Sequence, residues 1–447
     1  MATRDENADA DPLGPVFVSA VSPPVPPPVP PPVPAPVSRG RISPPARPPW
    51  WRRVAFALVL LLLVGSIPAL AVFGSQLIAD SQDGSFAGRQ LLPSDPGFEA
   101  QVEPTSTAVA IHFDGDNLPT AVTFLALSGA DGGGSVIFVP LDSEVSEPVY
   151  GIGDLRTAYQ TVAGDPELAK ERLASQVSRL LNVGIDEIIE LSNPGWEQLV
   201  APVVPLRIDN PDAMDIGYGI TFPSGPIEIP ADLVGAYLST TLPNESDLNR
   251  LNRHAVVWEA WLEQVAASGR DDAVPGETTA GIGRFARALS AGPVLYETLP
   301  VNDFDPVARV WDVDVPGVNR LVTEAVASPT AAVPGSRFTV RLLNGVSADA
   351  VPGEIVRQVV GRGGAVTILG NGPEFGTDET TIVYANPKQA DVAKLLATSL
   401  GATGKVRLDR EAPDTVDLTI VLGRDVLGSS SGGGTPGATT PDPPEGN

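Results

Sequence analysis

Residues suited to covalent or metal chemistry are scarce in this sequence. Its 447 residues include no cysteine and two histidines, His112 and His254, which lie far apart along the chain. The absence of cysteine excludes thiol nucleophiles, disulfides, cysteine-ligated zinc and iron–sulfur clusters. The two histidines do not have the spacing of metal ligands. Cysteine-based and histidine-based metal chemistry is therefore not predicted.

A glycine-rich segment, residues 129–134, has the composition of a phosphate-binding loop. Such loops cradle phosphate when a Lys-Ser/Thr pair follows and a helix begins directly after them. Neither feature is present here, since the apolar residues 136–140 follow instead. The segment is therefore predicted to be the turn of a hairpin between strands at 121–126 and 136–140.

His254 lies on a predicted helix that begins at the N-cap residue Ser246. Apolar residues recur on this helix at steps of three and four and form one continuous face: Leu248, Leu251, Ala255, Trp258, Leu262 and Val265. His254 lies beside that face. We predict a hydrogen-bonded or partly exposed structural histidine rather than a catalytic one.

The elements that must position any site fall into two regions. In residues 107–327 the pattern predicts strands at 108–113, 121–126, 136–140 and 185–191, with helices at 166–181 and from Ser246. In residues 337–425 it predicts strands at 338–343, 365–369, 380–384 and 418–422, with helices at 349–360 and 387–400. The second region is a small α/β sandwich without an acid/base pair or a nucleophile–base motif.

An uncharged run at residues 54–79 is predicted to be a transmembrane helix. At about 1.5 Å per residue it is long enough for the roughly 30 Å hydrocarbon core. Trp50, Trp51 and five arginines precede it without a carboxylate from residue 39 onward, and the first charge after it is Asp80. The positive-inside tendency places the N-terminus in the cytoplasm and the rest outside. The prediction is therefore a single-pass protein of the cell membrane, with the lipid bilayer as a partner.

A cleaved signal peptide is the alternative for the same run, because residues 69–71 form an A-x-A pattern. The 53 residues that precede the run and its apolar continuation past Ala71 favour an uncleaved anchor.

Charge and composition limit the partners. The net charge of −25 is carried almost entirely after the anchor, since the first 53 residues hold six arginines against four acids. An acidic exported body disfavours binding to nucleic acid through bulk charge, so no nucleic-acid partner is predicted. The hydrophobic content of 43% is enough to fill the cores of two or three domains.

Four segments are predicted to lack a core of their own. Residues 1–53 are disordered and contain a polyproline II tract at 23–34, which is a stiff spacer or a ligand for a cytoplasmic partner. Residues 80–106 are a polar stalk, residues 328–336 a linker, and residues 427–447 a flexible Ser/Gly-rich tail.

The sequence VIFVPLDSEV at residues 136–145 resembles the LytR-CpsA-Psr (LCP) family of bacterial envelope proteins. In that family an apolar strand is followed by Pro-Arg-Asp-Thr. Residues 154–159, 181–186 and 249–254 resemble further family segments in the same order. Residues 337–425 resemble the C-terminal domain that often follows, with LLNG at 342–345 and VLGRD at 421–425.

The resemblance implies a fold and an activity. The fold is α/β: a mixed-sheet α-β-α LCP-like domain at 107–327 and a small C-terminal α/β sandwich at 337–426, behind one N-terminal transmembrane helix. Family members transfer glycopolymers from a polyprenyl-pyrophosphate carrier to a cell-wall acceptor, usually with Mg²⁺. Arginines hold the pyrophosphate, and aspartates hold the metal or activate the acceptor.

This chain departs from the family at those positions. Leu141 stands in place of the arginine of Pro-Arg-Asp-Thr, and residues 118–121 lack the arginine and the aspartate of an upstream Arg-Ser-Asp-Thr motif. Asp154 replaces a lysine, and residues 201–205 lack the Asp-x-x-Gly-Gly pattern. The remaining catalytic candidates are Asp142, Arg250 and Arg253, with Asp142 as a weak metal ligand. Each has a structural alternative, Asp142 as a strand terminator and the arginines as solvated helix charges paired with Asp247 or Glu259.

Three functions follow as hypotheses. The leading one is a non-catalytic binding or scaffold component of envelope assembly, with no cofactor. The second is an active phosphotransferase with a rearranged site and Mg²⁺. The third is a tethered protein-interaction module. The predicted partners are a polyprenyl-linked glycan, a cell-wall polymer or envelope proteins.

Overall fold

The computed structural model describes residues 91–129, 132–147, 151–217, 219–243, 245–411 and 415–430 of the chain. The predicted Pro-rich segment 1–53, the predicted transmembrane helix 54–79 and residues 431–447 of the predicted tail lie outside these ranges. Within the described ranges, no helix combines the length and the apolar character needed to cross a bilayer.

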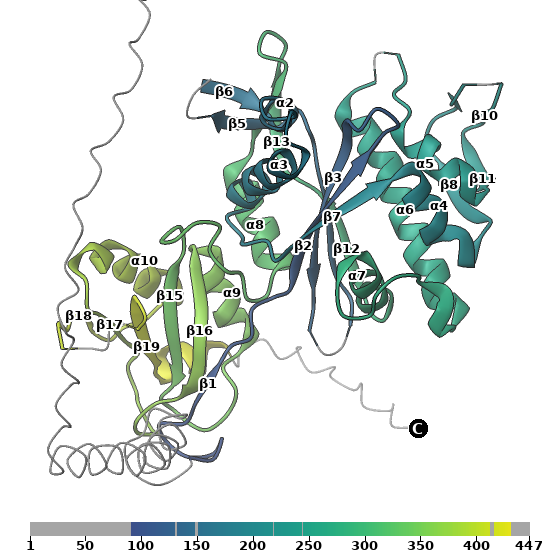
Figure 1. Cartoon of the computed structure of the whole chain (residues 1–447). Helices are drawn as coiled ribbons and strands as arrows, with labels where there is room; N and C mark the ends of the chain where they lie inside the picture. The colour runs from purple at the N-terminus through teal and green to yellow at the C-terminus, as the bar shows by residue number, and fades with distance from the viewer. Residues whose placement is uncertain are drawn as a thin grey trace, which may run out of the picture. The chain divides into compact units, whose positions relative to one another are not determined.

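A five-stranded mixed sheet forms the centre of the first region (Figure 1), in the order β12-β4-β3-β2-β7. Its strands are β2 (Thr107–Phe113), β3 (Pro119–Leu127), β4 (Gly134–Val139), β7 (Glu187–Ser192) and β12 (Val294–Thr298). β3 is antiparallel to β2 and β4, whereas β2 pairs with β7 and β4 with β12 in parallel. The antiparallel β3–β4 pair confirms the hairpin predicted around the glycine-rich segment.

Helices cover both faces of this sheet. Successive side chains of a strand point to opposite faces, and in β2 Ala108 and Ala110 join one buried apolar cluster while Val109 and Ile111 join another. The first cluster is completed by α4 (Asn193–Val200), α5 (Ala231–Ser239), α6 (Asp247–Ser268) and α7 (Gly281–Ser290). The second is completed by α2 (Leu155–Gln160), α3 (Pro166–Leu181) and α8 (Val315–Ala325). The predicted mixed-sheet α-β-α arrangement is confirmed.

Short ribbons and turns that the sequence pattern does not predict lie at the edges of this region. The two-stranded sheets are β5 (Glu144–Glu147) with β6 (Gly151–Asp154), β8 (Leu206–Asn210) with β11 (Gly225–Ile229), β9 (Met214–Asp215) with β10 (Thr221–Phe222), and β13 (Val301–Asp305) with β14 (Val310–Val313). Two 3₁₀ turns follow helices: η1 (Ala201–Val203) lies between α4 and β8, and η2 (Asp271–Ala273) lies between α6 and α7. The strands of these two-stranded sheets are too short for hydrophobic periodicity to identify them.

The two long helices begin and end where local chemistry dictates. The Asp165 side chain accepts a hydrogen bond from the Leu168 N–H and Pro166 occupies the first turn, so α3 starts at the predicted residue. The Ser246 hydroxyl accepts from the Asn249 N–H at 3.2 Å and thereby caps α6 as predicted. Gly269, with φ at +60°, ends α6 in the left-handed conformation that glycine adopts most readily.

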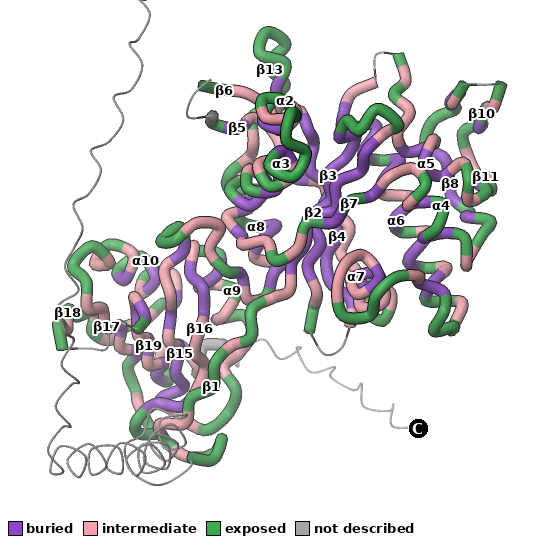
Figure 2. The backbone as a smooth tube through the Cα atoms, in the orientation of Figure 1, coloured by how far each residue is buried: buried purple, intermediate pink, exposed green. Residues whose placement is uncertain are grey.

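The second region contains a six-stranded sheet in the order β1-β16-β15-β19-β17-β18. Five of the six strands come from the second region itself: β15 (Phe338–Asn344), β16 (Gly364–Asn371), β17 (Thr381–Tyr384), β18 (Val406–Leu408) and β19 (Leu418–Leu422). α9 (Gly353–Gly361), η3 (Pro387–Gln389) and α10 (Ala390–Leu400) accompany them, and the buried faces of the sheet and helices form one apolar cluster (Figure 2). The helix predicted from residue 349 begins later, because Pro352 disfavours helical geometry in the residue before it.

Two predicted segments need correction. The stalk predicted at 80–106 includes β1 (Glu99–Gln101), which pairs antiparallel with β16 and so belongs to the sheet of the second region. Residues 427–430 of the predicted tail belong to α11 (Arg424–Ser430). Strand β1 has only three residues, all exposed, and α11 has only seven, so both are too short for hydrophobic periodicity to identify them.

Candidate functional site

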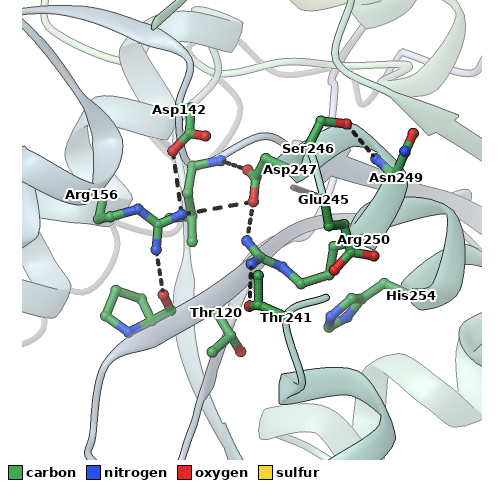
Figure 3. A network of polar contacts seen from close by, with 12 residues as sticks. Thr120, Asp142, Arg156, Thr241, Glu245, Ser246, Asp247, Asn249, Arg250 and His254 are labelled. Carbon is green, nitrogen blue, oxygen red and sulfur yellow. Dashed lines mark hydrogen bonds and ion pairs between the residues drawn. The ribbon is translucent and has the colours of Figure 1, made fainter. Parts of the chain in front are cut away.

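Three elements bring Asp142 and Arg250, two of the three predicted site residues, into one neighbourhood, which Figure 3 shows in detail. Asp142 lies in the turn that follows β4. Arg156 lies on the first turn of α2, and Asp247 and Arg250 lie on the first turn of α6. The sheet holds the turn in place, because β4 is buried along its whole length. The helix N-termini therefore meet at the carboxyl end of a central strand.

Asp247 is the centre of this neighbourhood. Its carboxylate accepts a hydrogen bond from the backbone N–H of Leu141 and forms an ion pair with Arg250. Nη2 of Arg156 lies 3.7 Å from its Oδ1. The Asp247 side chain is only 2% exposed, so these contacts replace nearly all of its hydration.

The pKa of Asp247 reflects two opposed effects. Burial raises it above the usual carboxyl range, whereas the Arg250 guanidinium lowers it. The Asp142 carboxylate adds to the rise, and Arg156 and the Leu141 N–H add to the decrease. The two guanidiniums thus offset the cost of placing this carboxylate inside the protein.

Asp142 and Arg156 form the accessible side of the network. Nη2 of Arg156 lies 3.3 Å from Oδ1 of Asp142, and the two side chains are 32% and 28% exposed. Nη1 of Arg156 donates to the carbonyl of Pro119 at 3.4 Å. Arg156 therefore bridges the carboxylates of Asp142 and Asp247.

Arg250 and Arg253 form two separate ion pairs. Arg250 binds Asp247 and donates to the Thr241 hydroxyl at 3.2 Å. Arg253 pairs with Glu245, and its Nη2 also donates to the Thr240 carbonyl at 2.5 Å. Arg253 and Glu245 are 0% and 4% exposed. Both arginines are buried rather than solvated, Arg250 has the partner named in the structural alternative, Asp247, and Arg253 pairs with Glu245 instead of Glu259.

Three of the positions at which this chain departs from the family pattern carry no charged side chain. Leu141 is fully buried and packs in the apolar cluster beneath α2 and α3. Thr120 is buried, and its hydroxyl donates to the backbone carbonyl of His112 at 3.2 Å. Leu118 is exposed at 45% and carries no polar group. None of the three provides a donor for a phosphate.

The two histidines meet beneath this network. Their ring centroids lie 5.7 Å apart in an edge-to-face arrangement. Nε2 of His112 lies 3.0 Å from Oδ1 of Asn193, and Nε2 of His254 lies 3.2 Å from the Leu238 carbonyl. Burial lowers the pKa of His112 to about 4 and that of His254 well below its ordinary value. Both rings are neutral at physiological pH, which agrees with the structural role predicted for His254.

Sequence reasoning missed three members of this network: Arg156, Asp247 and Glu245. Arg156 lies within a segment that resembles the family but does not match one of its charged positions. Asp247 enters the sequence argument only as an exposed partner for an arginine, although it is buried. A carboxylate three residues before an arginine at a helix start was the available signal for Asp247. No comparable spacing identifies Glu245, which precedes α6.

The network does not fit a divalent cation. Hard cations bind several oxygen ligands, whereas Asp142 and Asp247 already pair with guanidiniums. Among the described residues there is no group of three acidic, histidine or cysteine side chains suited to a metal. Neither of the two described cavities, of about 610 and 420 Å³, is lined by Asp142, Arg250 or Arg253.

Comparison with known proteins gives one family match. Residues 337–425 match the LytR_C family, described as LytR cell envelope-related transcriptional attenuator. The resemblance stated for this region from sequence is thus confirmed, and the chain carries a domain of this family. A search of curated proteins finds no match.

Solved structures with a similar arrangement include members of the LytR-CpsA-Psr family. A LytR-CPS2A-psr family protein, YwtF (TagT), with bound octaprenyl pyrophosphate lipid, is 13% identical, with 55% of this chain and 96% of that chain covered at a TM-score of 0.39. TagV of B. subtilis is 12% identical, with 50% and 96% covered at a TM-score of 0.41. A transcriptional regulator of Enterococcus faecalis is 16% identical, with 50% and 86% covered at a TM-score of 0.38.

Proposed function

We propose that this protein is a membrane-anchored component of bacterial envelope assembly that binds or scaffolds its partner without catalysing transfer. The LytR_C match of residues 337–425 supports the envelope assignment. The motifs at residues 136–145, 154–159 and 249–254 support an LCP-like role for the first region. The charge step around residues 54–79 supports an anchor with the N-terminus in the cytoplasm.

One observation carries the non-catalytic part of the proposal: each guanidinium of the candidate site has a carboxylate partner. Arg156 pairs with Asp142, Arg250 with Asp247, and Arg253 with Glu245. Pyrophosphate displacement requires positive groups that neutralise charge growing in the transition state. A network whose charges cancel internally provides little net attraction for that charge, and two of its three ion pairs are buried.

The proposed ligand is a polyprenyl-linked glycan or a cell-wall polymer. The departures from the family pattern remove charge at Leu118, Thr120 and Leu141, whereas the apolar core of the region is complete. Loss of hydrogen-bond donors to phosphate lowers the affinity for a pyrophosphate more than the affinity for an apolar or neutral ligand. Binding without transfer is therefore the expected behaviour.

A rearranged phosphotransferase is the second candidate, and Arg156 is the observation that favours it. Its guanidinium is partly exposed and lies beside Asp142. In that reading Arg156 exchanges Asp142 for an incoming phosphate and supplies the positive group that Leu141 lacks. Asp142 is then free to accept a proton from the acceptor hydroxyl.

Transfer assays distinguish these candidates. The purified protein is incubated with a polyprenyl-pyrophosphate glycan, an acceptor wall polymer and Mg²⁺, and product and binding are measured separately. Binding without product is expected. Turnover that disappears in Asp142→Ala or Arg156→Ala contradicts the proposal and favours the phosphotransferase. If neither turnover nor binding is seen, the interaction module is tested by recovering membrane partners with and without residues 1–49.

The anchor is tested by reporter fusions after Ala79. A reporter active only outside the cytoplasm should give a strong signal, and one active only in the cytoplasm none. The opposite pattern overturns the proposed localisation.

A further inference from the structure

A short segment that precedes the first region is bound along one edge of the C-terminal sheet (Figure 1). Residues 93–102, here called the latch, contain β1, whose register places Glu99 opposite Gly370 and Gln101 opposite Ile368 of β16. The family match of the C-terminal domain covers residues 337–425 and so does not include this strand. The domain is thus completed by a segment from far upstream in the sequence.

Backbone hydrogen bonds hold the latch on both sides of β1. The Asn371 N–H donates to the Phe98 carbonyl at 2.8 Å, and the Gly97 N–H donates to the Gly372 carbonyl at 2.8 Å. At the other end, the Val102 N–H donates to the Thr367 carbonyl at 2.9 Å. These contacts require only an extended chain, so the edge of β16 can bind other extended segments in the same register.

Two side chains add specificity to this edge. Nδ2 of Asn371 donates to the carbonyls of Pro93 and Asp95, each at 2.8 Å. Arg341, on the neighbouring strand β15, forms an ion pair with Glu99. A cation aimed at the latch selects a segment with a carboxylate at this register position.

Gly370 explains why the backbones come so close. A Cβ atom at this position would lie 2.1 Å from the Phe98 carbonyl oxygen, and its three nearest atoms all belong to Phe98 and Glu99. A methyl group at residue 370 therefore opposes a strand on this edge. The rest of the domain presents no closer atom.

The latch is weakly buried compared with the strands it joins. Glu99, Ala100 and Gln101 are all exposed, whereas Val340, Leu342 and Leu343 of β15 are buried. Segments with few buried apolar contacts open at a lower free-energy cost than the core. The edge of β16 is thus covered by the part of its sheet that is easiest to remove.

We propose that the latch binds reversibly and that the β16 edge beneath it is a docking surface for an extended acidic peptide of a partner protein. The latch supplies the example of the bound form, in which an aromatic residue, Phe98, precedes a glutamate, Glu99, that pairs with Arg341. When the latch is bound the edge is closed. When it opens, the partner strand takes the same register.

A competition experiment with the full chain tests this proposal. The probe is a fluorescent synthetic peptide of residues 91–105. Glu99→Arg places two cations together and weakens the latch, so the peptide should bind this variant about tenfold more tightly than the wild type, because the binding-competent fraction rises. Gly370→Ala added to Glu99→Arg should abolish binding. Equal affinity in the wild type and Glu99→Arg, or binding that survives Gly370→Ala, overturns the proposal.

A charge swap keeps the test independent of folding defects. Arg341→Glu should reject the wild-type peptide and accept one with arginine in place of Glu99. Gly353→Ala is the matched control for an added methyl group, because its nearest neighbour is 3.7 Å away. Hydrogen exchange provides the second measurement: the amides of Gly97, Val102 and Asn371 should exchange faster than those of β15. Exchange of the latch amides only upon global unfolding contradicts the reversible latch.

Discussion

The carboxylate of Asp247 accepts a hydrogen bond from the backbone N–H of Leu141, a residue 106 positions earlier in the chain. This contact joins the turn after β4 to the first turn of α6. It places a buried acid where the family resemblance predicts an arginine side chain to act, and it does so through the main chain. The side chain of Leu141 is then free to fill the core.

Removal of the Asp247 carboxylate should destabilise the fold strongly. Asp247→Ala leaves Arg250 buried without its ion-pair partner, and breaking a buried pair in this way costs about 3–5 kcal/mol. Asp142→Ala is the control, because the Asp142–Arg156 pair is partly exposed and such pairs contribute about 0–1 kcal/mol. Urea unfolding of both variants measures the difference. Equal losses for the two contradict the central role of Asp247.

Stability should fall as the pH falls below about 6.5, the ordinary histidine pKa. The pKa of His112 in the folded protein is about 4, so the unfolded chain binds the proton first and acid favours unfolding. The contribution is fully present above pH 6.5 and is lost as the pH falls toward 4. With about 1.4 kcal/mol per pKa unit, the loss from His112 approaches roughly 3 kcal/mol.

His254 should add to this loss in the same direction, since burial and His112 lower its pKa. Urea midpoints measured between pH 7 and pH 4.5 test the prediction. Among charged groups, Asp114 raises the pKa of His112, Arg250 lowers the pKa of both histidines, and Arg253 lowers that of His254. A midpoint that stays constant over this range is incompatible with two buried neutral rings.

The Asp425 side chain should stabilise the C-terminal domain against unfolding. Its carboxylate accepts from the N–H and hydroxyl of Thr380 at 2.9 and 2.7 Å and from those of Thr403 at 2.8 and 2.9 Å. Burial alone would raise the pKa of Asp425, but the combined effect of these hydrogen bonds is larger and lowers the pKa to about 2. Asp425→Ala should cost about 1–3 kcal/mol, because the donors of the buried Thr380 lose their acceptor.

An aspartate without such a set of hydrogen bonds provides the control for Asp425. Asp391 is exposed and lies 3.9 Å from Lys394, so Asp391→Ala should change stability by less than about 0.5 kcal/mol. Thermal unfolding monitored by a probe in the C-terminal domain compares the two. A similar loss of stability from both substitutions contradicts a stabilising role for the hydrogen bonds of Asp425.

Gly235→Ala should destabilise α5 although alanine favours helices. A Cβ at residue 235 would lie 2.4 Å from the Cα of Asn193, so α4 must move. Asn193 contacts His112, and the chemical shifts of that ring should change as well. In Gly353→Ala in α9 the added methyl group meets only an ordinary contact, 3.7 Å from the Arg357 side chain, so this variant should instead gain roughly 0.5–1 kcal/mol. Stabilisation by both substitutions is incompatible with the close approach of α5 to Asn193 at Gly235.

Local patterns predicted the long elements well. Residues 166–181 combine an N-cap aspartate, a proline in the first turn and helical spacing, so both ends of α3 could be placed. Strands β2, β3, β4 and β19 are apolar runs bounded by turn residues. The predicted start of α9 at residue 349 is too early, because Pro352 disfavours helical geometry in the residue before it.

The site could be predicted only in part, because its partners are set by the tertiary fold. Asp142 and Arg250 do lie in one network, but Asp247 and Arg156 connect them from positions that carry no motif. Arg253 shares the helix of Arg250, yet its partner Glu245 lies before that helix. Periodicity indicates which face of a helix is apolar, and it gives no information on which charges that face carries into the interior.

Strand β1 also constrains the order in which the protein is made and folded. Glu99 and its partner Arg341 are 242 residues apart, so a ribosome must complete the whole first region before the second sheet can close. The first region is thus an insertion within the C-terminal sheet, bracketed by β1 and β15. Pairings of such long sequence separation form slowly, and β1 must wait with an unpaired edge during synthesis. A gene truncated after the first region would produce a strand without a partner.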